Sequence, residues 1–259
     1  MSRPGDALRS AFTRARLANV RSLGRRPLTE CFLGTHIDTG AELFIKALHA
    51  DTPDVHRNFL REIDVIQALH NRPGFPVVHA FSTEPGTMFH ACERLYAPRF
   101  DQLARNDRLD LDIILRLAQA LAAWLQRLHA LGYVHRDLSP DHVFTCDQIT
   151  VVDFGLAKRL DGVDADDRQR YIGYDVQAFG LVLWEMICGH HIFTYRSPGL
   201  AREIPPQLAL IHSLELPPPL ARALKGCLAA RSEMSPHGIP HEGFITADEI
   251  VAALRVDGD

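Results

Sequence analysis

Apolar and polar positions in the first third of the chain follow a strand spacing and then a helical one. Residues 31–48 form two strand-like runs on either side of a turn at 38–40, which predicts a hairpin. Apolar side chains recur at helical spacing across residues 55–70, so a helix is predicted there. Two more strand-like runs lie within residues 75–95. We therefore expect a small sheet with one main helix in this part of the chain.

After Pro98 the pattern becomes mainly helical. Residues 111–132 form a strongly apolar stretch with a helical period, and residues 142–155 predict a short hairpin. Residues 174–189 are apolar nearly all round, which is typical of a buried helix. A T-x-x-E capping box at 246–249 predicts the start of a late helix.

These two patterns predict an α+β chain with two lobes. The first is a small antiparallel-sheet lobe with one main helix over residues 23–95, and the second is a larger, mostly helical lobe over residues 96–259. Residues 1–22 are basic and amphipathic, and we expect an N-terminal helix or extension. Its apolar side either packs on the domain, which we favour, or the segment contacts an anionic surface or RNA.

Composition narrows the class of protein. The chain has 259 residues and is 46% hydrophobic, which is enough for a substantial core. Its net charge of −4 gives no reason to expect nucleic acid as a partner. No apolar run approaches the roughly 20 residues of a membrane span. Five scattered cysteines without a CxxC spacing indicate reduced thiols. With the high Ala, Arg and Leu usage, we expect a bacterial cytoplasmic protein; secretion into a host cell stays open.

Four ionisable residues stand in an order that suits phosphoryl transfer. That reaction needs a cation for the phosphates, an acid to fix the cation, and carboxylates for metal and acceptor hydroxyl. Lys46 ends a predicted strand, Glu62 lies in the next helix, Asp137 follows the apolar helix, and Asp153 ends the hairpin. Taken singly, each has an ordinary explanation as a solvated side chain or a turn cap. Only their shared order and spacing point to chemistry.

The chain resembles the protein kinase family over roughly residues 20 to 255. Its FIK, the helix FLREIDVIQAL, HRDLSPDH and DFG match the family's V-A-I-K strand, ion-pair helix, H-R-D-L-x-x-x-N loop and metal motif. The resemblance implies that Lys46 holds phosphates and that Glu62 is its ion-pair partner. It implies a catalytic base at Asp137 and a metal ligand at Asp153. ATP and Mg²⁺, or Mn²⁺, are the implied cofactors.

The resemblance also assigns supporting residues. Arg136, beside the base, would bind an acidic group of the activation segment, and Asp175 would bond back to the catalytic loop. The hinge, from Glu93 to Leu95, would read adenine through its backbone. Gly24 is the residue that remains of the family's glycine-rich loop over the phosphates.

The nucleotide site departs from the family pattern on two sides. Arg26 and Thr29 stand where the family has its later glycines, which lets side chains obstruct the approach of backbone to phosphate. Phe44 replaces a small alanine over the adenine, and Phe144 lies on the opposite wall. The two rings either stack on a base or fill the pocket, and we favour partial filling.

The catalytic loop departs from the pattern as well. His142 replaces a metal-binding asparagine, and imidazole suits Mn²⁺ better than Mg²⁺. One metal would remain on Asp153, with Asp141 and His142 as candidate helpers. Alternatively, His142 only hydrogen-bonds Asp137 and shapes the loop, the reading that we favour. Ser139 replaces a lysine that would neutralise the transferred phosphoryl group.

The predicted activation segment is short. Residues 153–175 contain no A-P-E and no Ser or Thr, only Tyr171 and Tyr174 as hydroxyl groups. Its acidic stretch, residues 160–167, either forms a solvated loop, which we favour, or pairs with Arg136 in place of a phosphate. A short segment lacks the usual platform for a peptide, so the substrate class stays open.

Three functions compete at this stage. The favoured one is an ATP-dependent phosphotransferase that acts on a protein Ser/Thr hydroxyl with Asp137 as base. The alternative is a pseudokinase, a binding or scaffolding module with weak or no nucleotide binding. The third is a kinase-fold enzyme with a small-molecule acceptor or AMP transfer. In each of the first two, a protein is the expected partner.

Overall fold

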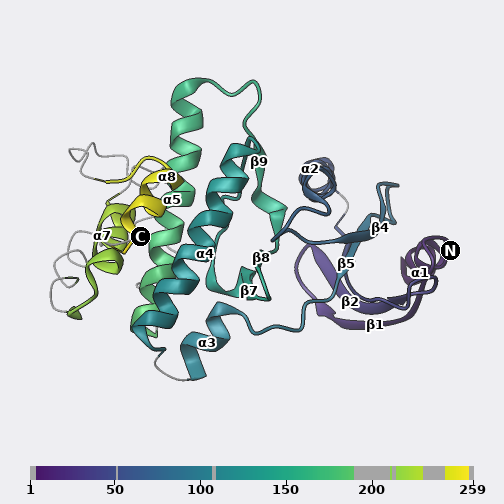
Figure 1. Ribbon diagram of the computed structural model, residues 1–259. Coiled ribbons are helices and arrows are strands. Elements are labelled where there is room, and N and C mark those ends of the chain that lie inside the picture. Colours follow the sequence, from purple (N-terminus) through teal and green to yellow (C-terminus); the bar gives the residue numbers. More distant parts are fainter. Residues whose placement is uncertain are drawn as a thin grey trace. The chain divides into compact units, whose positions relative to one another are not determined.

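The protein consists of two compact units, each with its own core (Figure 1). The computed structural model describes residues 4–50, 52–106, 109–189, 211, 214–229 and 243–256. The first unit ends at Tyr96 and also includes Phe154–Leu156, while the second contains the rest of the chain from Ala97 onward. A sheet in the first unit and mainly helices in the second confirm the predicted α+β class.

The first unit is built on a five-stranded antiparallel sheet in the order β1-β2-β3-β5-β4. Its strands are β1 (Leu17–Arg25), β2 (Thr29–His36), β3 (Glu42–Leu48), β4 (Val78–Ser82) and β5 (Phe89–Glu93). The predicted hairpin within residues 31–48 is confirmed as β2 and β3.

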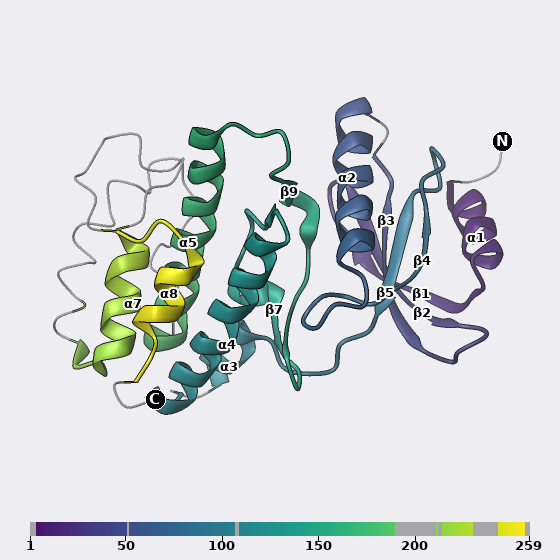
Figure 2. The same ribbon diagram turned by 45° about the horizontal axis from the view of Figure 1, so that its top comes forward.

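The sheet lies between α1 (Pro4–Arg14) and α2 (Pro53–Leu69), one on each face (Figure 2). Side chains alternate along a strand. On β3, Leu43 and Ile45 therefore point to the cluster that contains Phe12 of α1. Lys46 points to the other face, toward α2. This alternation is what brings a strand lysine to a helix glutamate.

The N-terminal segment differs from the prediction in its extent. Helix α1 ends at Arg14, and β1 begins at Leu17, inside the stretch 1–22 that was expected to precede the lobe. The reason is that Leu17 is buried in the sheet core and pairs with His36 of β2. Of the two uses considered for the helix, the structure has the packed one, because the Phe12 side chain is 3% exposed.

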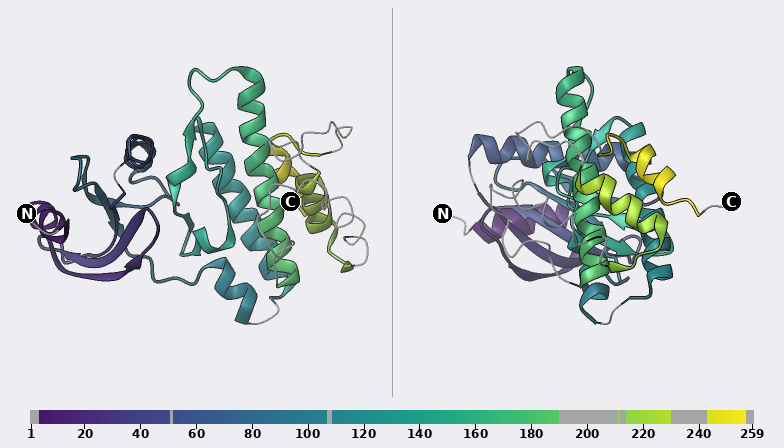
Figure 3. Two further views of the ribbon diagram at one scale, coloured as in Figure 1. Left: turned by 180° about the vertical axis from the view of Figure 1, so that it is seen from behind. Right: turned by 90° about the vertical axis from the view of Figure 1, so that its left-hand side faces the viewer.

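The second unit is formed by α3 (Phe100–Asn106), α4 (Leu111–Ala130), α5 (Ala165–Cys188), α7 (Pro218–Leu228) and α8 (Ala247–Ala253). Helices α4 and α5 lie side by side, and α7 and α8 pack on them (Figure 3). The capping box of Thr246 and Glu249 at the start of α8 is confirmed. In the part of the chain that the structure describes, no helix is long and apolar enough to span a bilayer.

Helix α5 begins well before the predicted residue 174, and this corrects the expectation of an acidic loop for residues 165–167, while residues 160–164 precede the helix. The Asp164 side chain caps the helix by accepting a hydrogen bond from the Asp167 amide. Asp166 and Asp167 occupy the first turn, where carboxylates interact favourably with the helix dipole. The acidic residues thus start a helix, a role that the apolar period alone did not reveal.

Two short strand pairs hold the loops that carry the motifs. Strand β6 (Tyr133–Val134) pairs with β9 (Lys158–Arg159), and the predicted hairpin is confirmed as β7 (Val143–Thr145) with β8 (Ile149–Val151). The loop between β6 and β7 contains the short 3₁₀ turn η1 (Pro140–His142). The loop follows β6 and precedes β7, and the partners of these two strands, β9 and β8, flank the segment that follows β8. The pairing therefore places the loop next to that segment.

Candidate functional site

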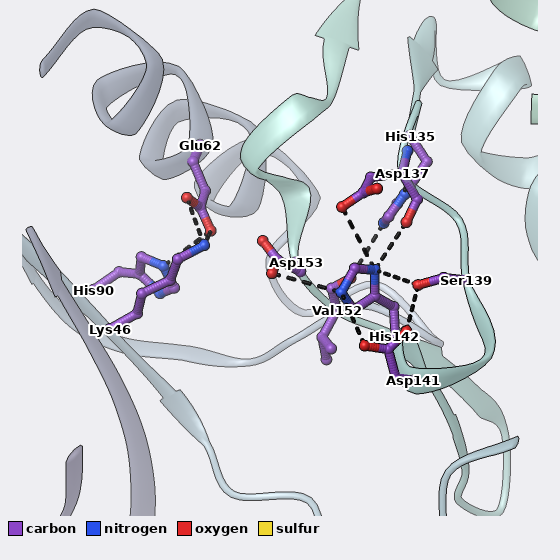
Figure 4. Close-up of polar contacts among 10 residues, drawn as sticks. All are labelled: Lys46, Glu62, His90, His135, Asp137, Ser139, Asp141, His142, Val152 and Asp153. Atoms are coloured by element: carbon purple, nitrogen blue, oxygen red, sulfur yellow. Dashed lines mark hydrogen bonds and ion pairs between the residues drawn. The ribbon is translucent and has the colours of Figure 1, made fainter. Parts of the chain in front are cut away.

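In the first unit, Lys46 and Glu62 form an ion pair. Lys46 Nζ lies 2.8 Å from Glu62 Oε1 and 3.1 Å from Oε2 (Figure 4). The Lys46 side chain is 16% exposed and that of Glu62 only 4%, so the pair is screened little by water. A buried carboxylate of this kind needs its partners, and the pairing fixes the ammonium at one position over the sheet.

The same carboxylate has a second basic neighbour that the sequence analysis missed. His90 Nε2 lies 3.2 Å from Glu62 Oε1, and the His90 side chain is buried. The register of the sheet explains the proximity, because β3 and β5 pair Lys46 directly with His90. A signal for this residue existed in the sequence, since a histidine on a predicted neighbouring strand can share a face with Lys46.

The other predicted nucleotide residues of this unit lie at exposed or half-buried positions. Glu93 ends β5 and is exposed, and Leu95 follows it at a half-buried position. The Phe44 side chain is 36% exposed on β3. Gly24 has a φ of 139°, in the region that favours glycine, at a bulge of β1. Whether these residues contact adenine and phosphate stays a prediction.

The turn between β1 and β2 is fastened rather than open. The Arg26 amide donates to the Thr29 carbonyl at 2.8 Å, which closes a tight turn over Pro27 and Leu28. The Leu28 carbonyl accepts hydrogen bonds from the amides of His49 and Ala50, at 3.1 and 3.3 Å. This turn therefore has fixed backbone where the family carries a glycine-rich loop.

In the second unit, the buried carboxylate of Asp175 holds the start of the catalytic loop. It accepts hydrogen bonds from the amides of His135 (2.8 Å) and Arg136 (2.7 Å) and from His129 Nε2 (2.9 Å). Arg136 has a φ of 65°, an uncommon conformation for a residue with a side chain. The expected bond of Asp175 to this loop is present, and it fixes the backbone just before Asp137.

His135 links the loop to the segment that leaves β8. Its Nδ1 accepts from the Asp137 amide at 3.3 Å, and its Nε2 donates to the Val152 carbonyl at 3.2 Å. Burial lowers the pKa of His135 to about 4, because the charged ring would be desolvated. The neutral tautomer is the one that this pair of contacts requires. His135 thus sets the spacing of the two loops as a neutral spacer.

His142 lies among three carboxylates (Figure 4). Its Nδ1 is 2.8 Å from the Asp137 carbonyl and 3.0 Å from Ser139 Oγ, which itself donates to Asp141 at 2.6 Å. A carbonyl oxygen only accepts, so Nδ1 carries a proton. The other ring nitrogen, Nε2, lies 3.6 Å from Asp153 Oδ2 and 3.9 Å from Asp141 Oδ2. The ring therefore shapes the loop through Nδ1 and presents Nε2 to Asp153.

These side chains offer a divalent metal few ligands of their own. Among the residues that the structure describes, no group of three or more His, Cys, Asp or Glu side chains is arranged to hold a metal ion. The Asp153 side chain is 28% exposed and that of Asp141 53%, so both have access to solvent. Magnesium commonly takes one or two carboxylates and completes its shell with water and substrate phosphates. Asp153 fits such a role, and Asp141 and His142 stay predicted helpers.

Arg136 extends toward an aromatic ring in the second unit. Its guanidinium lies 5.0 Å from the centre of the Tyr171 ring, and Lys158 lies 4.2 Å from the same centre. Lys158 Nζ also donates to the Tyr171 hydroxyl at 2.8 Å. The acidic stretch of residues 160–167, predicted as a possible partner of Arg136, contains four aspartates, and two of them have other partners: Asp161 pairs with Arg159 and Asp167 with Arg170. The clustering of cations on Tyr171 was not foreseen from the sequence.

Phe144, the other aromatic residue of the predicted base pocket, belongs to the β7–β8 hairpin. It is half-buried, pairs with Thr150 across the hairpin, and forms an isolated bridge with Arg99. Its backbone is thus fixed from both sides. That Phe144 and Phe44 narrow a base pocket stays a prediction.

Comparison with known proteins gives consistent matches. A model of the protein kinase domain family matches residues 17–213. The chain is 25% identical to the serine/threonine-protein kinase Pkn1 of Myxococcus xanthus over 231 residues, or 77% of this chain and 32% of that protein. It is 28% identical to the serine/threonine-protein kinase SBK1 of Mus musculus over 201 residues, or 66% of this chain and 47% of that protein. The chain thus spans less than half of the length of either relative.

The family match agrees with the fold at its start, since it begins at Leu17, where β1 begins. It includes the strand of Lys46, the helix of Glu62 and the loops of Asp137 and Asp153. The match covers well over half of the chain. The chain therefore belongs to the protein kinase domain family.

Proposed function

We propose that this protein is an ATP-dependent phosphotransferase that transfers a phosphoryl group to a Ser or Thr hydroxyl of a protein. The observation that carries the proposal is the bidentate contact of Lys46 with Glu62, at 2.8 and 3.1 Å. Kinase chemistry requires this pair for holding the nucleotide phosphates. Burying the charges of an ion pair costs free energy of folding. A chain that did not use Lys46 would gain little from keeping this pair, so the pair supports a retained nucleotide site.

The second unit supports the proposal through the position of its acids. Asp175 holds the backbone before Asp137, and the Asp137 side chain is 26% exposed, which leaves it accessible to an acceptor hydroxyl. In this role Asp137 orients the hydroxyl and takes its proton. When bound, ATP with a divalent cation supplies the transferable phosphoryl group, and Asp153 is the residue that would hold the cation. The serine/threonine kinases among the relatives support a protein acceptor.

A second candidate is a pseudokinase, and the β1–β2 turn favours it. The turn is closed over Pro27 and Leu28 and lacks the glycines that let a backbone wrap phosphates. In this alternative the protein is a binding or scaffolding module with weak or no nucleotide binding. Because the segment before α5 is short and lacks the usual platform for a peptide, a kinase-fold enzyme with a small-molecule acceptor or AMP transfer is the third candidate. The scattered cysteines support a reducing compartment, such as the bacterial cytoplasm, as the location.

Nucleotide binding separates these candidates first. Thermal unfolding of the whole protein should shift upward when ATP is added with Mg²⁺ or Mn²⁺, because a ligand of the native state stabilises it. The absence of a shift with either metal would contradict both enzyme candidates and favour the pseudokinase. If ATP binds, radiolabel at the γ or the α position distinguishes phosphoryl transfer from AMP transfer.

The base is tested by Asp137→Asn and Asp137→Ala. Both should lower phosphorylation by about a hundredfold or more while ATP binding stays close to that of the wild type, since the base acts on the acceptor hydroxyl. Asp64→Asn is the matched control, because Asp64 is exposed on α2 and its loss should leave activity unchanged. Full activity in the Asp137 variants would mean that another group is the base.

A further inference from the structure

The Lys46–Glu62 pair has a third member, His90, which kinase chemistry does not require. Glu62 Oε1 lies 2.8 Å from Lys46 Nζ and 3.2 Å from His90 Nε2, so one carboxylate oxygen joins two bases (Figure 4). The carboxylate comes from α2, and the two bases come from neighbouring strands, β3 and β5. Glu62 and His90 are 3% and 6% exposed, which makes this a buried network. Such networks fix geometry when each group has a partner.

The contacts determine where the protons lie. A carboxylate oxygen accepts only, so His90 Nε2 carries a proton and donates it to Glu62. The other ring nitrogen, Nδ1, lies 3.6 Å from Cys92 Sγ on the same strand. The Phe59 ring of α2 covers the imidazole at 5.7 Å, and the strand neighbour on β4 is the apolar Phe81. Among the described residues, Glu62 and Cys92 are the titratable groups in contact with His90, and Lys46 is its cross-strand pair.

The contacts of His90 favour its charged form. Burial lowers its pKa, but the hydrogen bonds to Cys92 and Glu62 together outweigh this effect and raise the pKa to about 9. The carboxylate of Glu62 is thus the shared partner of Lys46 and of the His90 ring.

We propose that His90 is a positioning residue that holds Glu62, and with it α2, against the sheet independently of any upstream signal. In kinases the formation of the lysine–glutamate pair is what activation controls, through the position of this helix. Here α2 is joined to two strands at one carboxylate, which favours the assembled pair in the absence of nucleotide. The inference rests on the proposed function, since it assigns the regulation of the same site.

The hold on Glu62 can be measured without nucleotide. A raised pKa in the folded state gives stability that is complete below pH 6.5 and is lost as the pH rises through about 9. The wild type should therefore lose stability in urea between pH 6.5 and 9 relative to His90→Gln, which cannot titrate. His36→Gln is the matched control, because His36 lies in the same unit, on β2, and contacts Thr39 Oγ1 instead. Parallel pH profiles of the wild type and His90→Gln would overturn the proposal.

The effect on the site is measured by ATP affinity at pH 7, by calorimetry on the full chain. His90→Met should weaken binding about tenfold, the effect of one lost hydrogen bond to a charged group, and His90→Gln, which still donates to Glu62, should weaken it less. His36→Gln should bind like the wild type. Equal affinity in His90→Met and the wild type would overturn the positioning role. If the wild type binds no nucleotide, the proposed function fails, and the pH profiles alone decide whether His90 holds Glu62.

Discussion

A single buried carboxylate, Asp175, determines whether the catalytic loop has a defined backbone. Three donors converge on it, and its side chain is 0% exposed. Asp175→Ala leaves two amides and His129 without this acceptor, so we expect a loss of about 3 kcal/mol or more in the free energy of unfolding. Asp175→Asn keeps one acceptor oxygen and should cost less. Urea unfolding at pH 7 measures both.

The matched control for this residue is Asp166→Ala. Asp166 is exposed in the first turn of the same helix, where its charge contributes at most about 1 kcal/mol through the helix dipole. If Asp175→Ala were as stable as Asp166→Ala, the hydrogen bonds from Asp175 to the amides of residues 135 and 136 would contribute nothing measurable to the free energy of unfolding. In that case the conformation of Arg136, with its φ of 65°, would need another explanation.

At the scale of residues, sequence reasoning located the four central ionisable side chains but not their neighbours. Lys46, Glu62, Asp137 and Asp153 stand in recognisable motifs along the chain. His90 carries no motif, because its role follows from the register of β3 and β5, which only the folded sheet defines. The contact of Arg136 with Tyr171 likewise depends on where α5 begins. A sequence motif identifies a residue, whereas the residues that surround it in space depend on strand pairing and helix packing.

At Gly180, helices α5 and α7 lie closer together than a residue with a Cβ atom would allow. A Cβ at this position would lie 2.7 Å from Cys227 Cβ and 3.2 Å from the Cys227 carbonyl carbon. Helix propensity alone would make Gly180→Ala stabilising by about 1 kcal/mol. The crowded contact should reverse the sign and destabilise the protein by about 1–3 kcal/mol in urea unfolding.

Gly5→Ala serves as the comparison, because nothing lies within 4 Å of a Cβ at Gly5 in α1. At Gly5 no steric contact offsets the higher helix propensity of alanine, so we expect Gly5→Ala to be neutral or slightly stabilising. A stabilising Gly180→Ala would show that the two helices can separate at little cost. The sign of the change, more than its size, tests the packing of α5 on α7.

At the scale of elements, periodicity predicted best where it was strong. The hairpin of β2 and β3, the helices α2 and α4 and the hairpin of β7 and β8 follow from spacing alone. The starts of β1 and α5 did not, because they depend on local chemistry: burial of Leu17 and capping by Asp164. Helix prediction from periodicity relies on apolar residues, so it assigns the acidic first turn of α5 to a loop.

For the molecule as a whole, the change of pattern after Pro98 predicted two lobes, but not that the chain returns to the first one. Phe154–Leu156 belongs to the first unit, although it follows Asp153 of the second. The reason is hydrophobic packing, since the Phe154 side chain is 1% exposed and its ring lies 6.2 Å from that of Phe75. A contact between residues this distant in sequence leaves no periodic signal.

Among the residues that the structure describes, His135 and His90 are the histidines that are almost fully buried, and their pKa shifts have opposite signs. His135 in the second unit has its pKa lowered to about 4 by burial, and His90 in the first has its pKa raised to about 9. Between pH 4 and 6.5 the unfolded chain binds a proton at His135 that the folded chain does not, so stability rises with pH. Between pH 6.5 and 9 the folded chain keeps a proton at His90 that the unfolded chain loses, so stability falls with pH.

These two residues therefore predict a maximum of stability near pH 6.5, and His79 of the first unit, whose pKa is lowered by burial, adds to the acid limb. The shifts of His135 and His90 each correspond to about 3 kcal/mol over their windows. In urea unfolding with EDTA present, His135→Gln should flatten the acid limb and leave the alkaline limb, because glutamine retains a donor and an acceptor without titrating. His90→Gln should do the reverse, so each variant is the control for the other. An acid limb of unchanged slope in His135→Gln would show that the ring is not held neutral, and the spacing of the two loops would then have to rest on other contacts.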